Sequence, residues 1–206
     1  MTPDQKDAIK GIVALFDKAE NKVKEVEQFA QELSIPSINE LRYVGYHLAR
    51  AMCESDEQEL NFQIDKATGH CKRAIFDAHE IGIIYMLERV RIFKEAYSPH
   101  ASSVLEVIPT YAEELSNSNK ASKFIAEIKE QHRNNRDDYY EDCIPHYETL
   151  RDIVERLTEA EPLISTKITE KVAKDIKDTR RFITTVSLTL LGLLITGSLL
   201  YLNISN

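Results

Sequence analysis

At two places in the chain an arginine is followed five or six positions later by a histidine, a combination suited to proton transfer and phosphate chemistry. Arg42 and His47 are five positions apart, and Arg73 and His79 are six positions apart. Imidazole exchanges a proton near neutral pH, and guanidinium stabilises negative charge on phosphate. Each pair is therefore a candidate catalytic site for acid–base chemistry at a phosphate ester.

The two segments, RYVGYH and RAIFDAH, resemble the R-x4-6-H motif of the HEPN superfamily. That superfamily comprises small helical domains, including metal-independent RNases and RNA-binding proteins. The resemblance implies that Arg42 and His47 act on the 2′-hydroxyl and the scissile phosphate of RNA, with Arg73 and His79 as the competing pair. RNA is a partner only under this interpretation.

A structural interpretation of the same residues stands beside the catalytic one. The two arginines would form salt bridges with acids such as Glu40 and Asp77. The two histidines would then be hydrogen-bonded packing residues. We favour this interpretation, and with it a chain that is not an enzyme.

Neither a metal nor a cofactor is expected. His70, Cys71 and His79 share one predicted helix, but their spacing is not typical of a helical zinc or di-iron site. The same holds for His47 and Cys53 on the neighbouring predicted helix. The chain has six glycines and no glycine-rich phosphate loop, no G-x-S-x-G and no dinucleotide fingerprint. Classical cofactor enzymes are therefore set aside.

The elements that must position these residues are helices, because helix-start signals recur and strand signals are nearly absent. Thr2 to Gln5 forms a capping box that opens a first helix, and Ser34 to Pro36 ends it. A second capping box, Ser37 to Glu40, predicts the start of a second helix. Ser55 to Gln58 opens a third and much longer one. The pattern predicts an all-α fold, a helical bundle with long antiparallel helices.

The third predicted helix carries an apolar stripe that alternates four- and three-residue steps, as expected of a core-facing surface. Its positions are Leu60, Ile64, Ala67, Cys71, Ala74, Ala78, Ile81 and Tyr85. Further along the chain, Pro109 interrupts the pattern and Thr110 is a candidate cap for a new helix. Residues 116–119 read as a polar connector, and Pro162 predicts a last break.

The C-terminal segment from Phe182 to Leu202 contains no charged residue. About 20 apolar residues at roughly 1.5 Å per residue cross a hydrocarbon core of roughly 30 Å as one helix. The segment is therefore predicted to be a transmembrane helix and a tail anchor, which makes membrane lipid a partner.

Charge around this segment predicts its orientation. Six basic residues precede it: Lys167, Lys171, Lys174, Lys177, Arg180 and Arg181. No charged residue follows it, so the positive-inside rule places the large N-terminal domain in the cytoplasm and the C-terminus on the far side. The three cysteines show no C-x-x-C pairing, which suits a reducing compartment.

The formal net charge of −8 is unevenly distributed. Residues 165–181 carry six basic and three acidic side chains, so residues 1–164 together carry a net charge of −11. This acidic balance disfavours broad, sequence-independent binding to nucleic acid, which depends on neutralising phosphates.

One face of the apolar segment carries small and hydroxylated residues at steps of four, three and four: Thr185, Thr189, Gly192 and Thr196. Such a face favours close association of helices in lipid, and in a ring of helices it would line a polar pore. In the alternative, the hydroxyl groups bond only to their own backbone. We favour self-association, and therefore a homo-oligomer.

Together these observations predict a cytoplasmic helical bundle over residues 1–164, a basic juxtamembrane amphipathic helix over 165–181 and a transmembrane helix over 182–202. The predicted function is a tail-anchored membrane protein that oligomerises as a scaffold, a docking module for a protein partner or a pore-forming effector. Size and layout are similar to those of small HEPN-like membrane proteins that act as accessory effectors in bacterial antiviral systems. The alternative is a membrane-tethered HEPN-like RNase or RNA-binding domain that uses Arg42 and His47.

Overall fold

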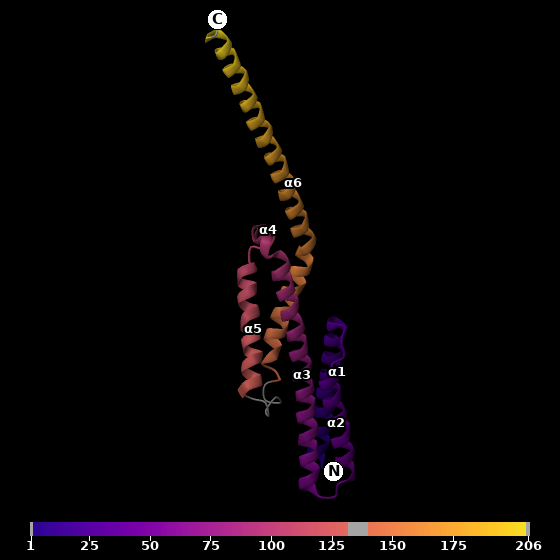
Figure 1. The fold of residues 1–206 in the computed structure, drawn as a ribbon. Coiled ribbons are helices and arrows are strands. Elements are labelled where there is room, and N and C mark those ends of the chain that lie inside the picture. The colour runs from indigo at the N-terminus through magenta and orange to yellow at the C-terminus, as the bar shows by residue number, and fades with distance from the viewer. Residues whose placement is uncertain (1, 132–139, 205–206) are drawn as a thin grey trace. The chain divides into compact units, whose positions relative to one another are not determined.

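The computed structural model of the chain describes residues 2–131 and 140–204, and within these residues the chain is helical with no strand (Figure 1). The all-α prediction is confirmed, including the long antiparallel helices and the long apolar helix at the C-terminus. The elements are α1 (Pro3–Ala30), α2 (Ile35–Cys53), α3 (Glu57–Tyr97), the 3-10 helix η1 (Ser98–His100), α4 (Ala101–Val107), α5 (Tyr111–Gln131) and α6 (Cys143–Ile204).

These elements form two compact units. The first unit, Met1–Pro99 with Pro109–Thr158, contains α1, α2, α3, α5 and the beginning of α6. The second unit, His100–Ile108 with Glu159–Asn206, contains α4 and the remainder of α6.

Caps define the starts of α1 and α3 as the sequence predicts. The Gln5 amide donates to Thr2 Oγ1 at 3.2 Å and the Thr2 amide donates to Gln5 Oε1 at 2.8 Å, which completes the capping box. At the start of α3 the Asp56 carboxylate accepts from the Glu59 amide at 3.0 Å. Both caps satisfy amides that have no partner inside the helix.

The start of α2 differs from the prediction, because the helix begins at Ile35 and not after Ser37. Pro36 stands in the first turn, where its missing N–H costs nothing. The hydroxyls of Ser34 and Ser37 bond to each other at 2.5 Å, and both serines are buried. Ser37 therefore belongs to the packed first turn of α2 and does not cap it.

The core of the first unit follows the predicted stripe of α3. Six of its members are buried: Leu60, Ile64, Ala67, Cys71, Ala74 and Ala78. Ile12 of α1 and Val44 and Ala51 of α2 pack into the same cluster. The small residues let the neighbouring helices approach α3 closely.

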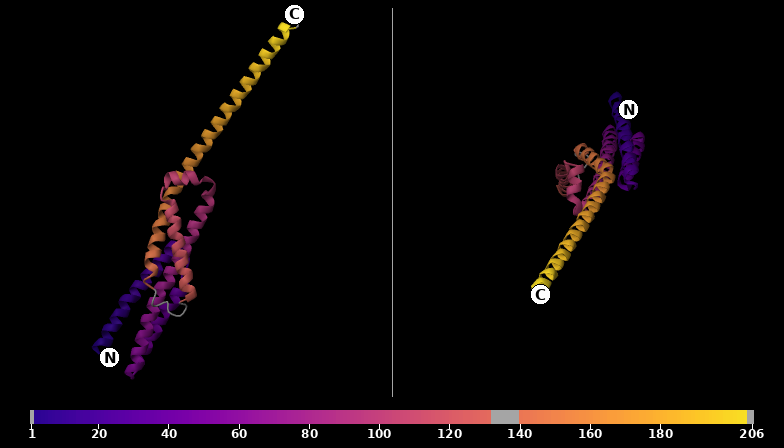
Figure 2. Two further views of the ribbon diagram at one scale, coloured as in Figure 1. Left: turned by 90° about the vertical axis from the view of Figure 1, so that its left-hand side faces the viewer. Right: turned by 90° about the horizontal axis from the view of Figure 1, so that it is seen from above.

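Two predicted interruptions are wrong, since both sites lie inside helices. Residues 116–119 are part of α5, where the buried Ser118 donates its hydroxyl to the Glu114 carbonyl at 2.9 Å. This internal bond satisfies the serine without a break in the helix. Pro162 lies within α6, which continues past it (Figure 2). A proline removes one backbone hydrogen bond, and at Pro162 that loss does not end the helix.

Candidate functional site

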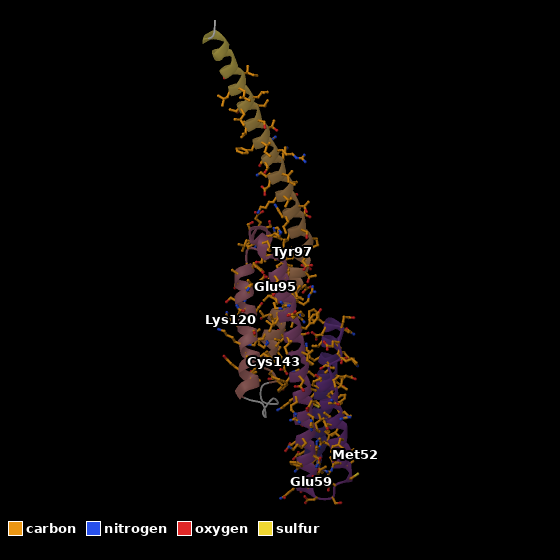
Figure 3. The ribbon with its side chains drawn as sticks, in the orientation of Figure 1. Met52, Glu59, Glu95, Tyr97, Lys120 and Cys143 are labelled. Atoms are coloured by element: carbon orange, nitrogen blue, oxygen red, sulfur yellow. The ribbon has the colours of Figure 1, made fainter. Side chains whose placement is uncertain are left out.

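Aromatic and imidazole rings of α2 and α3 form a stack in the first unit. The rings of His47 and His70 are 4.9 Å apart between centroids at an interplanar angle of 21°, and Tyr43 stacks on His70 at 5.2 Å. His47 Nδ1 donates to Gln63 Oε1 at 2.6 Å, and Gln63 in turn donates to Glu59, the residue labelled near the start of α3 in Figure 3. The stack is thereby fixed at both helices.

An acidic residue joins this stack to an arginine. Glu40 Oε2 accepts from Arg73 Nε at 3.0 Å and lies 2.7 Å from His70 Nδ1. Arg73 Nη2 also lies 2.8 Å from the same His70 nitrogen. We call Glu40, Tyr43, His47, His70 and Arg73 the α2–α3 cluster.

His70 Nδ1 cannot bond to both neighbours at once. A protonated nitrogen donates to the Glu40 carboxylate, whereas a nitrogen with a free lone pair accepts from the Arg73 guanidinium. Burial lowers the pKa of His70 below its ordinary value, with Arg73 and His47 acting in the same direction and Glu40 opposing them. Whether Nδ1 carries a proton, which depends on the tautomer as well as on the charge of the ring, therefore determines which of its two charged neighbours His70 bonds.

The structure separates the first predicted pair. Arg42 and His47 are five residues apart on α2, about 140° around the helix axis. Arg42 lines a groove of about 360 Å³ with residues of α1 such as Phe16 and Glu20. His47 instead bonds to Gln63 of α3.

The second pair is separated too, because Arg73 bonds to Glu40 of α2 whereas His79 is 1% exposed in the core. His79 Nδ1 donates to the Ile75 carbonyl at 2.8 Å, and the Nε2 lone pair has no hydrogen-bond partner among the described residues. The ring of Tyr147 from α6 lies edge-on to His79 at 5.1 Å. Arg73 therefore contacts a carboxylate, and His47 and His79 are hydrogen-bonded within the first unit.

Tyr147 connects His79 to a carboxylate on α1. Its hydroxyl donates to Glu25 Oε1 at 3.0 Å, and its ring fits against Gly82, where an added Cβ would lie 2.5 Å from Tyr147 Cε2. We call Glu25, His79, Gly82 and Tyr147 the core histidine cluster. Burial lowers the pKa of His79 to about 4, so its imidazole is neutral at physiological pH.

The small-residue face of α6 is open in the structure. Thr185, Thr189, Gly192 and Thr196 are all exposed, and a Cβ added at Gly192 would meet no atom within 4 Å. The hydroxyls of the three threonines donate to backbone carbonyls four residues earlier at 2.9–3.0 Å. The threonine hydroxyls therefore bond to the backbone of their own helix, as the alternative to self-association expects. The face itself is exposed and open to packing by another helix.

The six basic residues before the apolar segment fall into two groups. Lys171 Nζ donates to Glu106 Oε1 of α4 at 2.7 Å, and Lys167 Nζ lies 4.0 Å from Glu106 Oε2. The remaining four are exposed: Lys174, Lys177, Arg180 and Arg181. Within the part of the chain that the structure describes, α4 contacts the first group through Glu106.

Sequence reasoning missed several participants: His70 and Tyr43 as ring partners, Gln63, Glu25, Tyr147 and Glu106. Local spacing gives no signal for them, because Glu106 and Lys171 are 65 residues apart and Glu25 and Tyr147 are 122 apart. Among the described residues, no group of three or more His, Cys, Asp or Glu side chains is placed to hold a metal ion.

The clusters of the first unit are buried and half-buried hydrogen-bond networks between helices. The second unit presents exposed apolar and basic surface on α6. Comparison with protein-family models, curated proteins and solved structures finds no match to this chain.

Proposed function

We propose that this chain is a single-pass membrane protein, anchored by Phe182 to Leu202, whose helical bundle lies in the cytoplasm and acts as a self-assembling scaffold. The observation that carries the proposal is the exposure of the apolar segment. Every residue from 182 to 197 is exposed, with Phe182 at 69% and Leu194 at 71%. Apolar surface in water costs about 25 cal/mol per Å², which favours a lipid environment for this helix.

Length and composition support the same conclusion, since α6 is long and apolar enough to cross a membrane. A core helix of a soluble domain would be covered by its own chain, but none of the apolar window of α6 is buried. The six basic residues that precede the segment favour an N-terminal domain in the cytoplasm.

The native cysteines provide the test of this topology. Cys53 is exposed, whereas Cys71 and Cys143 are buried, so a folded chain offers one reactive thiol in its N-terminal unit. In membranes washed with alkaline carbonate the protein should stay in the pellet. In separate, sealed vesicles without carbonate treatment, an impermeant maleimide should label Cys53 when the vesicles are inside-out. In right-side-out vesicles it should label Cys53 only after detergent is added. Release by carbonate would reject the anchor, and the reverse labelling pattern would reject the orientation.

Self-assembly is proposed through the face of Thr185, Thr189, Gly192 and Thr196. Because each threonine hydroxyl donates to its own backbone, the face carries little free polarity for a water-filled pore. Small residues do let two helix backbones approach closely in lipid. These contacts favour a scaffold held by helix packing over a pore.

A pair of matched variants tests the face. Thr189→Leu with Gly192→Leu places two large side chains on it, whereas Ser187→Leu with Gly197→Leu replaces one hydroxylated residue and one glycine elsewhere around the helix. The first variant should reduce the mass of the full-length protein in detergent, measured by light scattering. The second should leave the mass unchanged. Equal masses for both variants and the unmodified chain would reject assembly through this face.

A further inference from the structure

The N-terminal edge of the apolar segment carries a groove of about 590 Å³ on one side of α6. Three basic side chains line it, Lys177, Arg180 and Arg181, together with the hydroxyls of Thr184 and Thr185. Ala173 and Ile176 complete the lining. The groove therefore combines positive charge with an apolar wall at the point where the proposed membrane anchor begins.

The basic side chains are the donors of this groove. Thr184 and Thr185 give their hydroxyl protons to the carbonyls of Arg180 and Arg181, both at 2.9 Å. Arg181 Nη1 forms a long ion pair with Asp178 at 4.0 Å, and because the Arg181 side chain is 71% exposed, water screens this contact. Guanidinium and ammonium groups in this position suit phosphate oxygens, which accept several charge-assisted hydrogen bonds.

Two lysines earlier in the basic stretch, Lys167 and Lys171, lie near a carboxylate of α4. Lys171 donates to Glu106 at 2.7 Å and to Ser102 Oγ at 3.1 Å, and Glu106 also lies 4.0 Å from Lys167. Lys171 lowers the pKa of Glu106, so the carboxylate stays ionised near neutral pH. Positive charge on these two lysines is thus partly neutralised by α4.

Position along the helix separates the two groups further. At about 1.5 Å per residue, Arg181 lies roughly 1.5 Å and Lys177 roughly 8 Å before Phe182, whereas Lys171 lies roughly 16 Å before it. Headgroups extend about 5–8 Å beyond the hydrocarbon core, and charges are screened over about 8 Å at physiological salt. The groove residues therefore fall at the depth of lipid phosphates, and Lys171 falls outside it.

We propose that Lys177, Arg180 and Arg181 bind the phosphate-bearing headgroup of an anionic phospholipid in the leaflet where the segment begins. The site rests on the proposed membrane anchor and adds a lipid preference to it. Charge complementarity selects an anionic headgroup over a zwitterionic one, because the latter brings its own cation.

The test uses the full-length protein in detergent micelles doped with phosphatidylglycerol or phosphatidylcholine, with bound lipid counted by native mass spectrometry. The unmodified chain should retain phosphatidylglycerol preferentially. The K177Q/R180Q/R181Q variant should lose that retention by on the order of a hundredfold in apparent affinity, from about 1 kcal/mol per basic residue. The R180K/R181K variant keeps the charge and should keep the preference.

The matched control is K167Q/K171Q, which removes charge from the same stretch but outside the groove. It should change phosphatidylglycerol retention by less than about threefold. Equal retention in K177Q/R180Q/R181Q and the unmodified chain, or equal retention of the two lipids by the unmodified chain, would overturn the proposal. Carbonate extraction separates the two ideas: a chain that stays in the membrane but shows no lipid preference rejects only the headgroup site.

Discussion

The α2–α3 cluster and the core histidine cluster both use histidine from α3, yet they place it in opposite surroundings. In the α2–α3 cluster, His70 is partly exposed between a carboxylate and a guanidinium. In the core histidine cluster, His79 is buried, and its Nε2 finds no hydrogen-bond partner in residues 2–131 and 140–204. This comparison indicates that burial and the groups packed around each ring, and not the motif in which a histidine sits, set its pKa.

The largest expected difference between the two clusters is in acid stability. His79 has a pKa of about 4 in the folded chain against 6.5 for an ordinary histidine, because burial penalises its charged form. The stability that neutral His79 contributes to the folded chain is therefore complete above pH 6.5. As the pH falls towards 4, the free energy of unfolding decreases on this account by on the order of 3 kcal/mol. Urea unfolding at several pH values should show a smaller acid loss in His79→Leu than in the unmodified chain. The same acid loss in both proteins would contradict this assignment.

The next effect is steric and confined to the core histidine cluster. A methyl group at Gly82 would lie 2.5 Å from the Tyr147 ring, which His79 and the hydrogen bond to Glu25 hold in place. Gly82→Ala should lower the free energy of unfolding by roughly 1–3 kcal/mol. Gly45→Ala is the control, since its added Cβ meets nothing within 4 Å and should stabilise α2 by roughly 0.5–1 kcal/mol. Equal changes in the free energy of unfolding at the two glycines would show that the Tyr147 ring moves aside to accommodate the added methyl group.

Removing a charge from the α2–α3 cluster should have a smaller effect. Glu40→Gln weakens the bonds to His70 and Arg73 and should cost about 1 kcal/mol in the free energy of unfolding. Glu40 raises the pKa of His70, so the variant should titrate His70 at a lower pH than the unmodified chain does. An NMR titration checks this direction, and a higher pKa in the variant would mean that Glu40 does not act on the ring.

The smallest effect is expected at the exposed end of the ring stack. Tyr43 is 43% exposed and stacks on His70, so Tyr43→Ala should cost about 0.5 kcal/mol. Met52→Ala serves as the control, because Met52 is 79% exposed and its loss should be neutral within error. A cost at Tyr43 no greater than that at Met52, measured by urea unfolding, would show that the stack is incidental.

Structural features that depend on residues close together in the sequence were predictable. The capping box at Thr2, the opening of α3 and the apolar stripe of α3 need only local hydrogen bonding and helical periodicity. The predicted interruptions at 116–119 and at Pro162 were wrong because each rested on residue type alone. The Ser and Asn residues at 116–119 predict a connector, but a buried serine such as Ser118 can bond to its own helix.

The candidate sites were less predictable, because their contacts join distant parts of the chain. The sequence pairs Arg73 with His79 by spacing, but the six-residue step places them on different sides of α3. The ion pair with Glu40 agrees with the structural interpretation, yet nothing local indicated that His70 would lie between them. Such contacts depend on how distant segments pack together, which the spacing of residues within a motif does not indicate.

The backbone bonds of the threonines in α6 have a consequence for insertion into a bilayer. Thr184, Thr185, Thr189 and Thr196 each use their hydroxyl proton within the helix. What remains toward hydrocarbon is mainly a methyl group, so each threonine partitions more like valine than its place on a hydropathy scale suggests. The segment should therefore be more soluble in hydrocarbon than its residue composition alone indicates.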